Sequence, residues 1–194
     1  MTIPGVDVTT AATLVAVIGD VRRFPTAKHL AGYLGLTPRV RQSGNAPARH
    51  GRISKEGSAA ARHVLLEAAW ITARAPGPLR AFALRTAARR GRHIATVAVA
   101  RKLAVLCWHL LTRGEDYAFQ RPSLVKRKLR ALELKAGAPR EKPGPNSSRT
   151  WNRSGEERER QIAEQAETAY RRLVTDWQAA RPRNGAGATP QRAC

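Results

Sequence analysis

Apolar residues recur every three or four positions along much of this 194-residue chain, which is the pattern of amphipathic helices. The first such stretch follows Thr9 or Thr10, either of which can cap a helix, and it stops at Gly19. A second, shorter helix is expected to begin after Thr26 and to end at Gly35. The residues expected to face inward from these two helices are Ala11, Leu14, Val15, Ile18, Leu30, Tyr33 and Leu34.

Three more helices are expected farther along the chain. Ser58 is the predicted N-cap of the first one, whose inward positions continue to Ile71, before a Pro-Gly-Pro break. The second covers about residues 79–90 and ends at Gly91. The third, about residues 94–111, is apolar around most of its circumference, so it is expected at the centre of the domain.

The predicted fold class is therefore all-α, with a compact helical domain over residues 1–119. Residues 36–57 interrupt the helices, because their prolines and glycines exclude a long helix. These breakers are Pro38, Gly44, Pro47, Gly51 and Gly57. Two short segments, 40–42 and 52–54, could pair as a loose hairpin within this loop.

The rest of the chain differs in composition. Residues 120–155 predict a basic helix followed by a flexible linker that is rich in Pro, Gly and Ser. Residues 156–180 predict one amphipathic helix, which could pack on the domain or on a partner helix, and residues 181–194 are expected to be disordered. The apolar residues that share one face of the amphipathic helix are Ile162, Ala166, Ala169, Leu173 and Trp177.

The net charge of the chain indicates what kind of partner it binds. The chain has 35 Lys and Arg against 14 Asp and Glu, a formal net charge of +21. A surface with that excess favours a polyanion, and we therefore expect DNA as a partner. Two cysteines and no signal peptide or membrane-length apolar run predict a cytoplasmic protein without a membrane partner.

The loop at residues 36–57 holds the candidate chemistry. Ser43 stands beside a glycine among basic residues, and a serine there can attack a phosphodiester and hold one DNA end covalently. A serine hydroxyl is a weak nucleophile without a base or metal, and the spacing supplies neither, although His50 could carry a proton. Without further information, a Ser-Gly pair in a loop is an ordinary turn. The residues expected to hold phosphates around Ser43 are Arg39, Arg41, Arg49, Arg52, Lys55 and Arg62.

Seven short motifs add a resemblance to a known family. In order they are Ile-Pro-Gly-Val at 3–6, Ile-Gly-Asp at 18–20, Tyr-Leu-Gly-Leu-Thr-Pro at 33–38, Gln-Ser-Gly at 42–44, Gly-Arg-Ile-Ser-Lys-Glu-Gly at 51–57, Val-Ala-Val-Ala-Arg-Lys-Leu at 97–103 and Gly-Glu-Asp-Tyr at 114–117. This series resembles the carboxy-terminal domain of the transposases of insertion sequences 110, 116 and 902, the RNA-bridged serine recombinases. The first motif also resembles the turn of a helix-hairpin-helix, which grips a DNA phosphate through backbone N–H groups. The resemblance implies that Ser43 is the nucleophile.

The same resemblance implies further partners. Members of this family carry a nuclease-like domain of the ribonuclease-H type, whose acidic residues bind divalent metal. We expect no cofactor in this chain itself and Mg²⁺ through such an acidic domain outside it. A guide RNA and a full-length transposase or a second copy are further expected partners. The predicted function is DNA transposition or recombination; the alternative is a non-catalytic DNA-binding module or a regulator of a full-length transposase.

Overall fold

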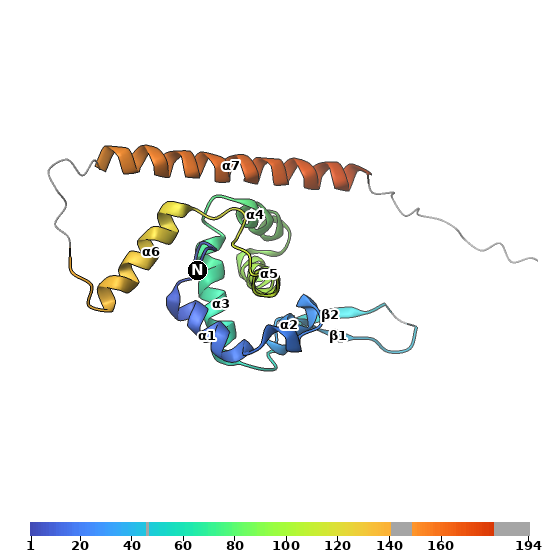
Figure 1. Cartoon of the computed structure of the whole chain (residues 1–194). Helices are drawn as coiled ribbons and strands as arrows, with labels where there is room; N and C mark the ends of the chain where they lie inside the picture. The colour runs from blue at the N-terminus through green and yellow to red at the C-terminus, as the bar shows by residue number, and fades with distance from the viewer. Residues whose placement is uncertain (46, 141–148, 181–194) are drawn as a thin grey trace, which may run out of the picture.

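The structure of this chain, a computed structural model, describes residues 1–45, 47–140 and 149–180 (Figure 1). The expected disordered tail and residues 141–148 of the expected linker lie outside the described residues. The elements, in chain order, are α1 Val8–Ile18, a 3-10 turn at Val21–Arg23, α2 Ala27–Tyr33, β1 Pro38–Arg41, β2 Arg49–Ile53, α3 Ala59–Thr72, α4 Pro78–Arg90, α5 Arg92–Arg113, α6 Pro122–Lys135 and α7 Arg149–Ala180.

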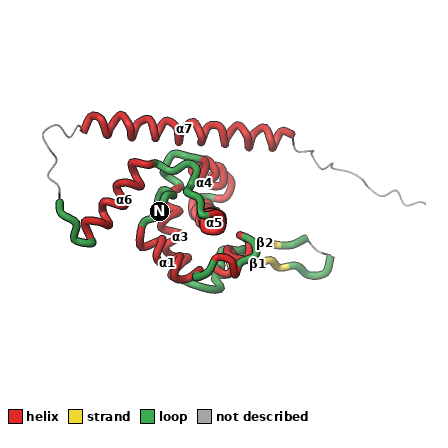
Figure 2. The backbone as a smooth tube through the Cα atoms, viewed as in Figure 1, coloured by secondary structure: helices red, strands yellow, loops and turns green. Residues whose placement is uncertain are grey.

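The all-α prediction is confirmed. Across the described residues, helices dominate and the sheet consists of the two strands β1 and β2, which pair antiparallel (Figure 2). This hairpin occupies the predicted interruption between α2 and α3. Its strands differ from the expected segments, because β1 starts two residues earlier and β2 three residues earlier than predicted.

The centre of the domain is α5, as its apolar sequence predicted. It packs against α2, α3 and α4, and Val99 and Leu103 are fully buried on it. Many of the other fully buried positions are alanines, which allow the helix axes to approach closely. The buried alanines of α3 and α5 are Ala61, Ala68, Ala69, Ala95, Ala100 and Ala104.

The length of α5 corrects one expectation. This helix is long and apolar enough, by length and composition alone, to cross a membrane, whereas no run of that length was expected. Arg101 and Lys102 lie in its middle, and its buried face packs on three other helices of the domain. It therefore has the surroundings of a core helix.

Several residues expected inside lie at the surface. Val15 and Ile71 are 57% and 56% exposed, because α1 and α3 turn the neighbouring stripes that contain Leu14 and Leu65 into the core, where α1 packs on α3 and α3 packs on α5. Tyr33 is 39% exposed. Its ring stacks at a tilt on that of Phe24, while the Arg23 guanidinium lies 5.1 Å from both ring centres.

Caps explain where helices begin. Ser58 caps α3 as predicted, since its hydroxyl oxygen accepts a hydrogen bond from the Ala61 N–H. The cap of α1 is Asp7 rather than Thr9 or Thr10: the Asp7 carboxylate accepts from the Thr10 N–H at 2.8 Å. That bond holds the pKa of Asp7 below its usual value of 3.8.

The opening Ile3-Pro4-Gly5-Val6 turn packs inside the domain. Gly5 has φ +87°, and a β-carbon on it would lie 2.5 Å from the Ala68 carbonyl oxygen of α3. The Thr72 hydroxyl lies 2.6 Å from the Pro4 carbonyl oxygen and can donate to it. These contacts give the turn a packing role, and its predicted grip on phosphate stays a prediction.

The helices after residue 119 fold back onto the domain. From α6, the Lys128 ammonium donates to the carbonyls of Met1, Ile3 and Val6 at 2.8–3.0 Å. From α7, the buried Glu167 carboxylate accepts from the Gly77 N–H and from Arg80 Nε at the start of α4. The extension is thus attached by two polar clasps.

The face by which α7 packs differs from its most apolar face. Ala163 and Glu167 are buried, while Ile162 and Leu173 are 63% and 66% exposed. The helix also begins at Arg149 rather than at residue 156. Polar bonds from Glu167 therefore set its rotation, which hydrophobic periodicity does not report.

Replacing Lys128 with Met should lower the free energy of unfolding by about 2 kcal/mol, because three carbonyl groups lose a charged donor. Urea unfolding followed by circular dichroism measures it. Lys126→Met, on the exposed face of the same helix, is the control and should stay within about 0.5 kcal/mol of the parent. Equal effects of the two substitutions would contradict the clasp.

Asp7→Ala should cost about 1 kcal/mol at pH 7. The folded-state pKa of Asp7 is lowered, so its stabilising contribution is present above 3.8 and is lost as the pH falls through the lower folded value. Ser58→Ala is the control, since a hydroxyl cap does not titrate and its cost should persist. Unfolding curves at pH 7 and pH 2.5 test this; a cost at Asp7 that is the same at both would oppose it.

Candidate nucleic-acid interface

The hairpin β1–β2 projects from the helical body as an arm (Figure 1). From residue 39 to residue 52 every described residue is exposed. Val40 pairs with His50 and Arg41 with Arg49, and the register shifts by one residue between Pro38 and Val40. A register shift of this kind is a bulge, which increases the twist of the strands.

Two glycines fasten this arm to the domain. Gly35, with φ +67°, would carry a β-carbon 2.0 Å from the Glu56 carbonyl oxygen, and Gly57, with φ +82°, one 1.9 Å from the Tyr33 carbonyl oxygen. No side chain larger than hydrogen fits at either position. The end of α2 and the chain that follows β2 therefore touch backbone to backbone.

Hydrogen bonds complete this junction. The Ser54 N–H donates to the Thr37 carbonyl at 2.8 Å, and the Lys55 N–H donates to the Gly35 carbonyl at 3.1 Å. Lys55 has φ +60°, the single positive value at a residue other than glycine in the described part of the chain. Such a conformation is uncommon for lysine and persists only where neighbouring contacts enforce it.

Two of the predicted phosphate contacts have structural partners. Arg62 Nη1 lies 3.0–3.3 Å from the carbonyl oxygens of Leu34, Glu56 and Gly57 and donates across the junction. Arg39 Nη2 donates to the Ser54 carbonyl at 3.1 Å. Arg62 therefore works as a staple at the base of the arm, and its contact with DNA stays a prediction.

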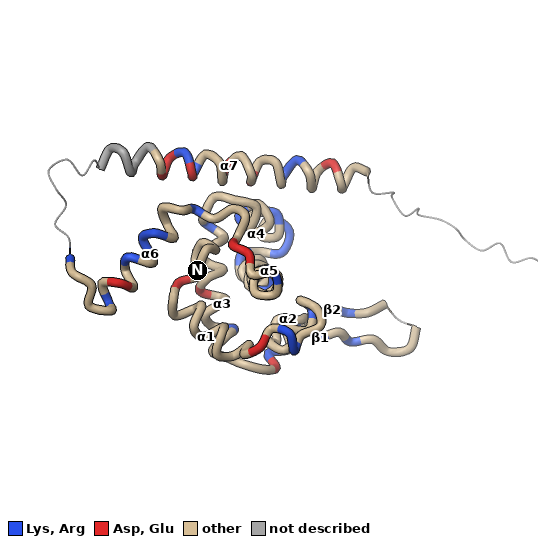
Figure 3. The backbone as a smooth tube through the Cα atoms, viewed as in Figure 1, with Lys and Arg blue, Asp and Glu red and all other residues tan. Residues whose placement is uncertain are grey.

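The remaining basic residues give the arm its electrostatic character. Arg41 and Arg49 are direct cross-strand partners, and like charges in that position repel. No Asp or Glu occurs between residues 21 and 55, and Figure 3 shows both strands with basic positions only. An anion between the two guanidinium groups would relieve the repulsion.

Ser43 lies in the exposed loop at the tip of the arm, between the two strands. Gly44 beside it has φ +53° and open space around it, so the loop turns sharply without contacting the body. No described side chain forms a hydrogen bond with the Ser43 hydroxyl, and His50 pairs across the sheet with Val40 instead. The structure therefore brings Ser43 near the basic strands but places no base against it.

The described residues offer no metal site either. Within them, no group of three or more His, Cys, Asp and Glu side chains is arranged to hold an ion. The Glu159 carboxylate of the extension accepts hydrogen bonds from the Ser123 N–H and hydroxyl. Mg²⁺ does not fit the residues described.

A second basic surface was missed by the sequence reasoning. Residues 68–114 contain nine Lys and Arg and no Asp or Glu. Four arginines crowd the corner where α4 ends and α5 begins, and Figure 3 shows this concentration. They are Arg85, Arg89, Arg90 and Arg92. The absence of acids over this stretch is the signal in the sequence that marks this surface.

Comparisons with known proteins agree with the motifs. Residues 1–84 match the model of the Transposase IS116/IS110/IS902 family. The transposase for insertion sequence element IS1111A of Coxiella burnetii is 36% identical over 119 residues, which are 59% of this chain and 32% of that protein. The insertion element IS110 43.6 kDa protein of Streptomyces coelicolor is 33% identical over 125 residues, 63% of this chain and 30% of that protein.

A third relative is named for the inversion of a gene. The pilin gene-inverting protein of Moraxella lacunata is 30% identical over 118 residues, 60% of this chain and 37% of that protein. The chain thus spans about a third of the length of the curated relatives it matches. The region that matches the IS116/IS110/IS902 family model, residues 1–84, holds the junction and the arm.

Gly35→Ala should lower the free energy of unfolding by about 2–4 kcal/mol, because the new methyl group meets the Glu56 backbone. Gly32→Ala in α2, where nothing lies within 4 Å, is the matched control and should be neutral or stabilising by up to about 1 kcal/mol. Thermal unfolding of both variants gives the comparison. Similar melting temperatures for the two would refute the close junction.

Proposed function

We propose that this chain is the serine-bearing, DNA-contacting part of a transposase or recombinase, and that Ser43 is its nucleophile. The observation that carries the proposal is the exposed arm, which presents Ser43 next to the opposed pair Arg41 and Arg49 without any acid on the strands. A DNA strand along this arm would bring its phosphates to both guanidinium groups. The match of residues 1–84 to a transposase family model supports the assignment.

The proposed reaction is two phosphoryl transfers. In the first, the Ser43 oxygen attacks a DNA phosphorus; the new O–P bond forms as the bond to the leaving sugar oxygen breaks, and that oxygen takes up a proton. In the second, a hydroxyl of another DNA end attacks the phosphoserine and releases Ser43. The Arg41 and Arg49 guanidinium groups would stabilise negative charge on the phosphate oxygens during both steps.

In this proposal, the base that accepts the Ser43 proton and the ligands of the metal come from outside the described residues. No described side chain forms a hydrogen bond with the Ser43 hydroxyl, and a base supplied by a partner would take its proton. The Mg²⁺ expected from the family resemblance would be held by carboxylates outside the described residues as well. A guide RNA and a cytoplasmic location belong to the same proposal.

The lack of a described base or metal site beside Ser43 favours a second function. A serine without a neighbouring base or metal site suits a module that binds DNA and breaks no bond. The arm and its arginines would then serve phosphate binding alone. The exposed residues Ile162 and Leu173 on α7 would suit assembly of such a module with a full-length transposase.

A covalent-capture experiment separates the two functions. The chain is incubated with junction DNA and Mg²⁺, with and without a separately supplied acidic domain of a family member, and run on a denaturing gel. We expect a DNA-linked band that disappears in Ser43→Ala and remains in Asn45→Ala, an exposed neighbour in the same loop. Gel-shift affinity should stay within about twofold for both variants, since neither changes a charge.

Two other outcomes of the covalent-capture experiment would contradict the role of Ser43. A band that persists in Ser43→Ala would assign the covalent link to another residue. The lack of any band under both conditions, together with tight salt-sensitive binding, would identify the chain as the non-catalytic module.

A further inference from the structure

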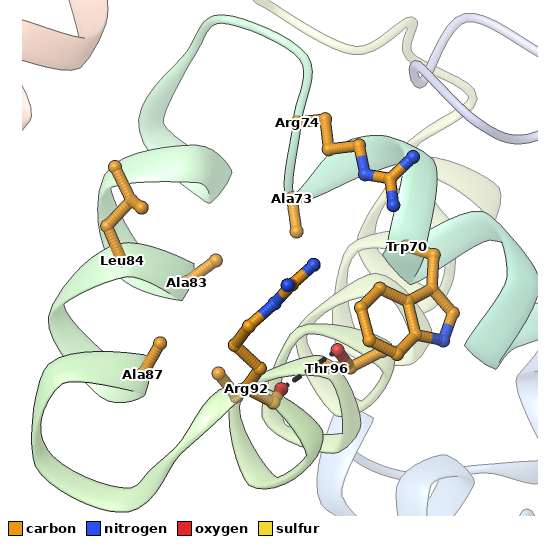
Figure 4. A pocket seen from close by; sticks show the side chains of 9 residues that line it. Trp70, Ala73, Arg74, Ala83, Leu84, Ala87, Arg92 and Thr96 are labelled. Carbon is orange, nitrogen blue, oxygen red and sulfur yellow. Dashed lines mark hydrogen bonds between the residues drawn. The ribbon is translucent and has the colours of Figure 1, made fainter.

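An apolar hollow opens between α3, α4 and α5, away from the arm. Its volume is about 250 Å³. Figure 4 shows Trp70 on one side, Ala83, Leu84 and Ala87 on the opposite side, and the Arg92 side chain extending into the space between them. The wall residues come from helices that pack on one another, so the packing of these helices defines the shape of the hollow.

Aromatic and guanidinium planes meet in this hollow. The Arg92 guanidinium carbon lies 5.7 Å from the centre of the Trp70 ring, and the His93 ring meets the same indole edge-on at 6.0 Å. Flat π-faces of this kind stack on nucleobases, whatever their sequence. A hollow below the usual 300–1,000 Å³ of drug-sized ligands suits a fragment such as one base.

The charge around the hollow indicates whether the base belongs to a nucleic-acid strand or to a free nucleotide. Arg74 and Arg92 line it, and none of its lining residues is acidic. The nearest acid along α3 is Glu67, whose carboxylate lies 3.3 Å from the His63 ring at the surface. Arg89 and Arg90 are exposed on α4 just beyond the hollow, so the positive charge continues past it. A continuing track of charge suits a strand with successive phosphates better than a free nucleotide.

We propose that this hollow receives a single unstacked base of a nucleic-acid strand, which lies against Trp70 and Arg92 while Arg74 and the arginines of the α4–α5 corner bind the adjoining phosphates. A base within an intact duplex cannot enter, because it is stacked and paired on both sides. The hollow therefore selects single-stranded or locally opened nucleic acid. The inference rests on the nucleic-acid ligand of the proposed function but on different residues, and it does not require Ser43 to be a nucleophile.

The test fills the hollow without changing any charge. Ala87→Phe places a ring in the space beside Arg92, whereas Ala88→Phe puts the same ring on the exposed face of α4. The full chain is titrated into a single-stranded oligonucleotide that contains 2-aminopurine, whose fluorescence falls when it stacks, and into the matching duplex. We expect Ala87→Phe to lose about tenfold in affinity for the single strand, the contribution of one stacked base, and to lose the quenching. Its duplex affinity and all properties of Ala88→Phe should match the parent within about twofold.

Trp70→Leu provides a second variant, in case Ala87→Phe does not fold. It keeps an apolar side chain in the hollow and should cause the same selective loss, with folding checked by circular dichroism. Equal single-strand affinities for Ala87→Phe and Ala88→Phe would overturn the proposal, as would a parallel loss of single-strand and duplex binding. DNA and RNA oligonucleotides are tested side by side, and the tighter one identifies the strand that the hollow takes. Failure of covalent capture through Ser43 would leave all these readings unchanged.

Discussion

The position of the candidate site depends on one backbone contact. Gly35 and Gly57 let the end of α2 and the segment after β2 approach so closely that a β-carbon on either glycine would overlap a carbonyl oxygen of the other segment. This contact, bridged by Arg62, is the main attachment between a two-stranded arm and the helical domain. A lone hairpin is marginally stable in water, so the arm owes its direction to this junction. Without it, Ser43 would have no defined place relative to α3.

Charge then distinguishes the parts of the molecule. The arm places Arg41 against Arg49, and the α4–α5 corner gathers four arginines without an acid in the surrounding sequence. Both arrangements cost free energy in the isolated chain, because like charges repel. Two acidic residues of α7, by contrast, form ion pairs with α4 and α6: Glu167 with Arg80 and Glu156 with Arg127. The surfaces that remain uncompensated are those suited to a polyanion.

The match of residues 1–84 to a transposase family model agrees with the positions of these surfaces. A region shared with transposases holds the junction, the arm and Ser43, whereas the described residues hold neither a base for that serine nor a metal site. The basic arm and the Ser43 hydroxyl thus lie together, and the described residues place no base or metal-binding cluster beside them.

The sequence alone determined the helices, the interruption between them and the excess of positive charge, because periodicity, Gly and Pro positions and net charge are local or additive properties. The motif at residues 51–57 was recognisable, but its purpose was not. Only the tertiary structure showed that Arg62 bonds to backbone carbonyls, since those carbonyls come from segments 5 to 28 residues away. Likewise, the rotation of α7 was set by the distant partners of Glu167, and Trp70 proved to line a hollow that three helices form together. Such features depend on which segments meet in space, and no spacing along the chain encodes that.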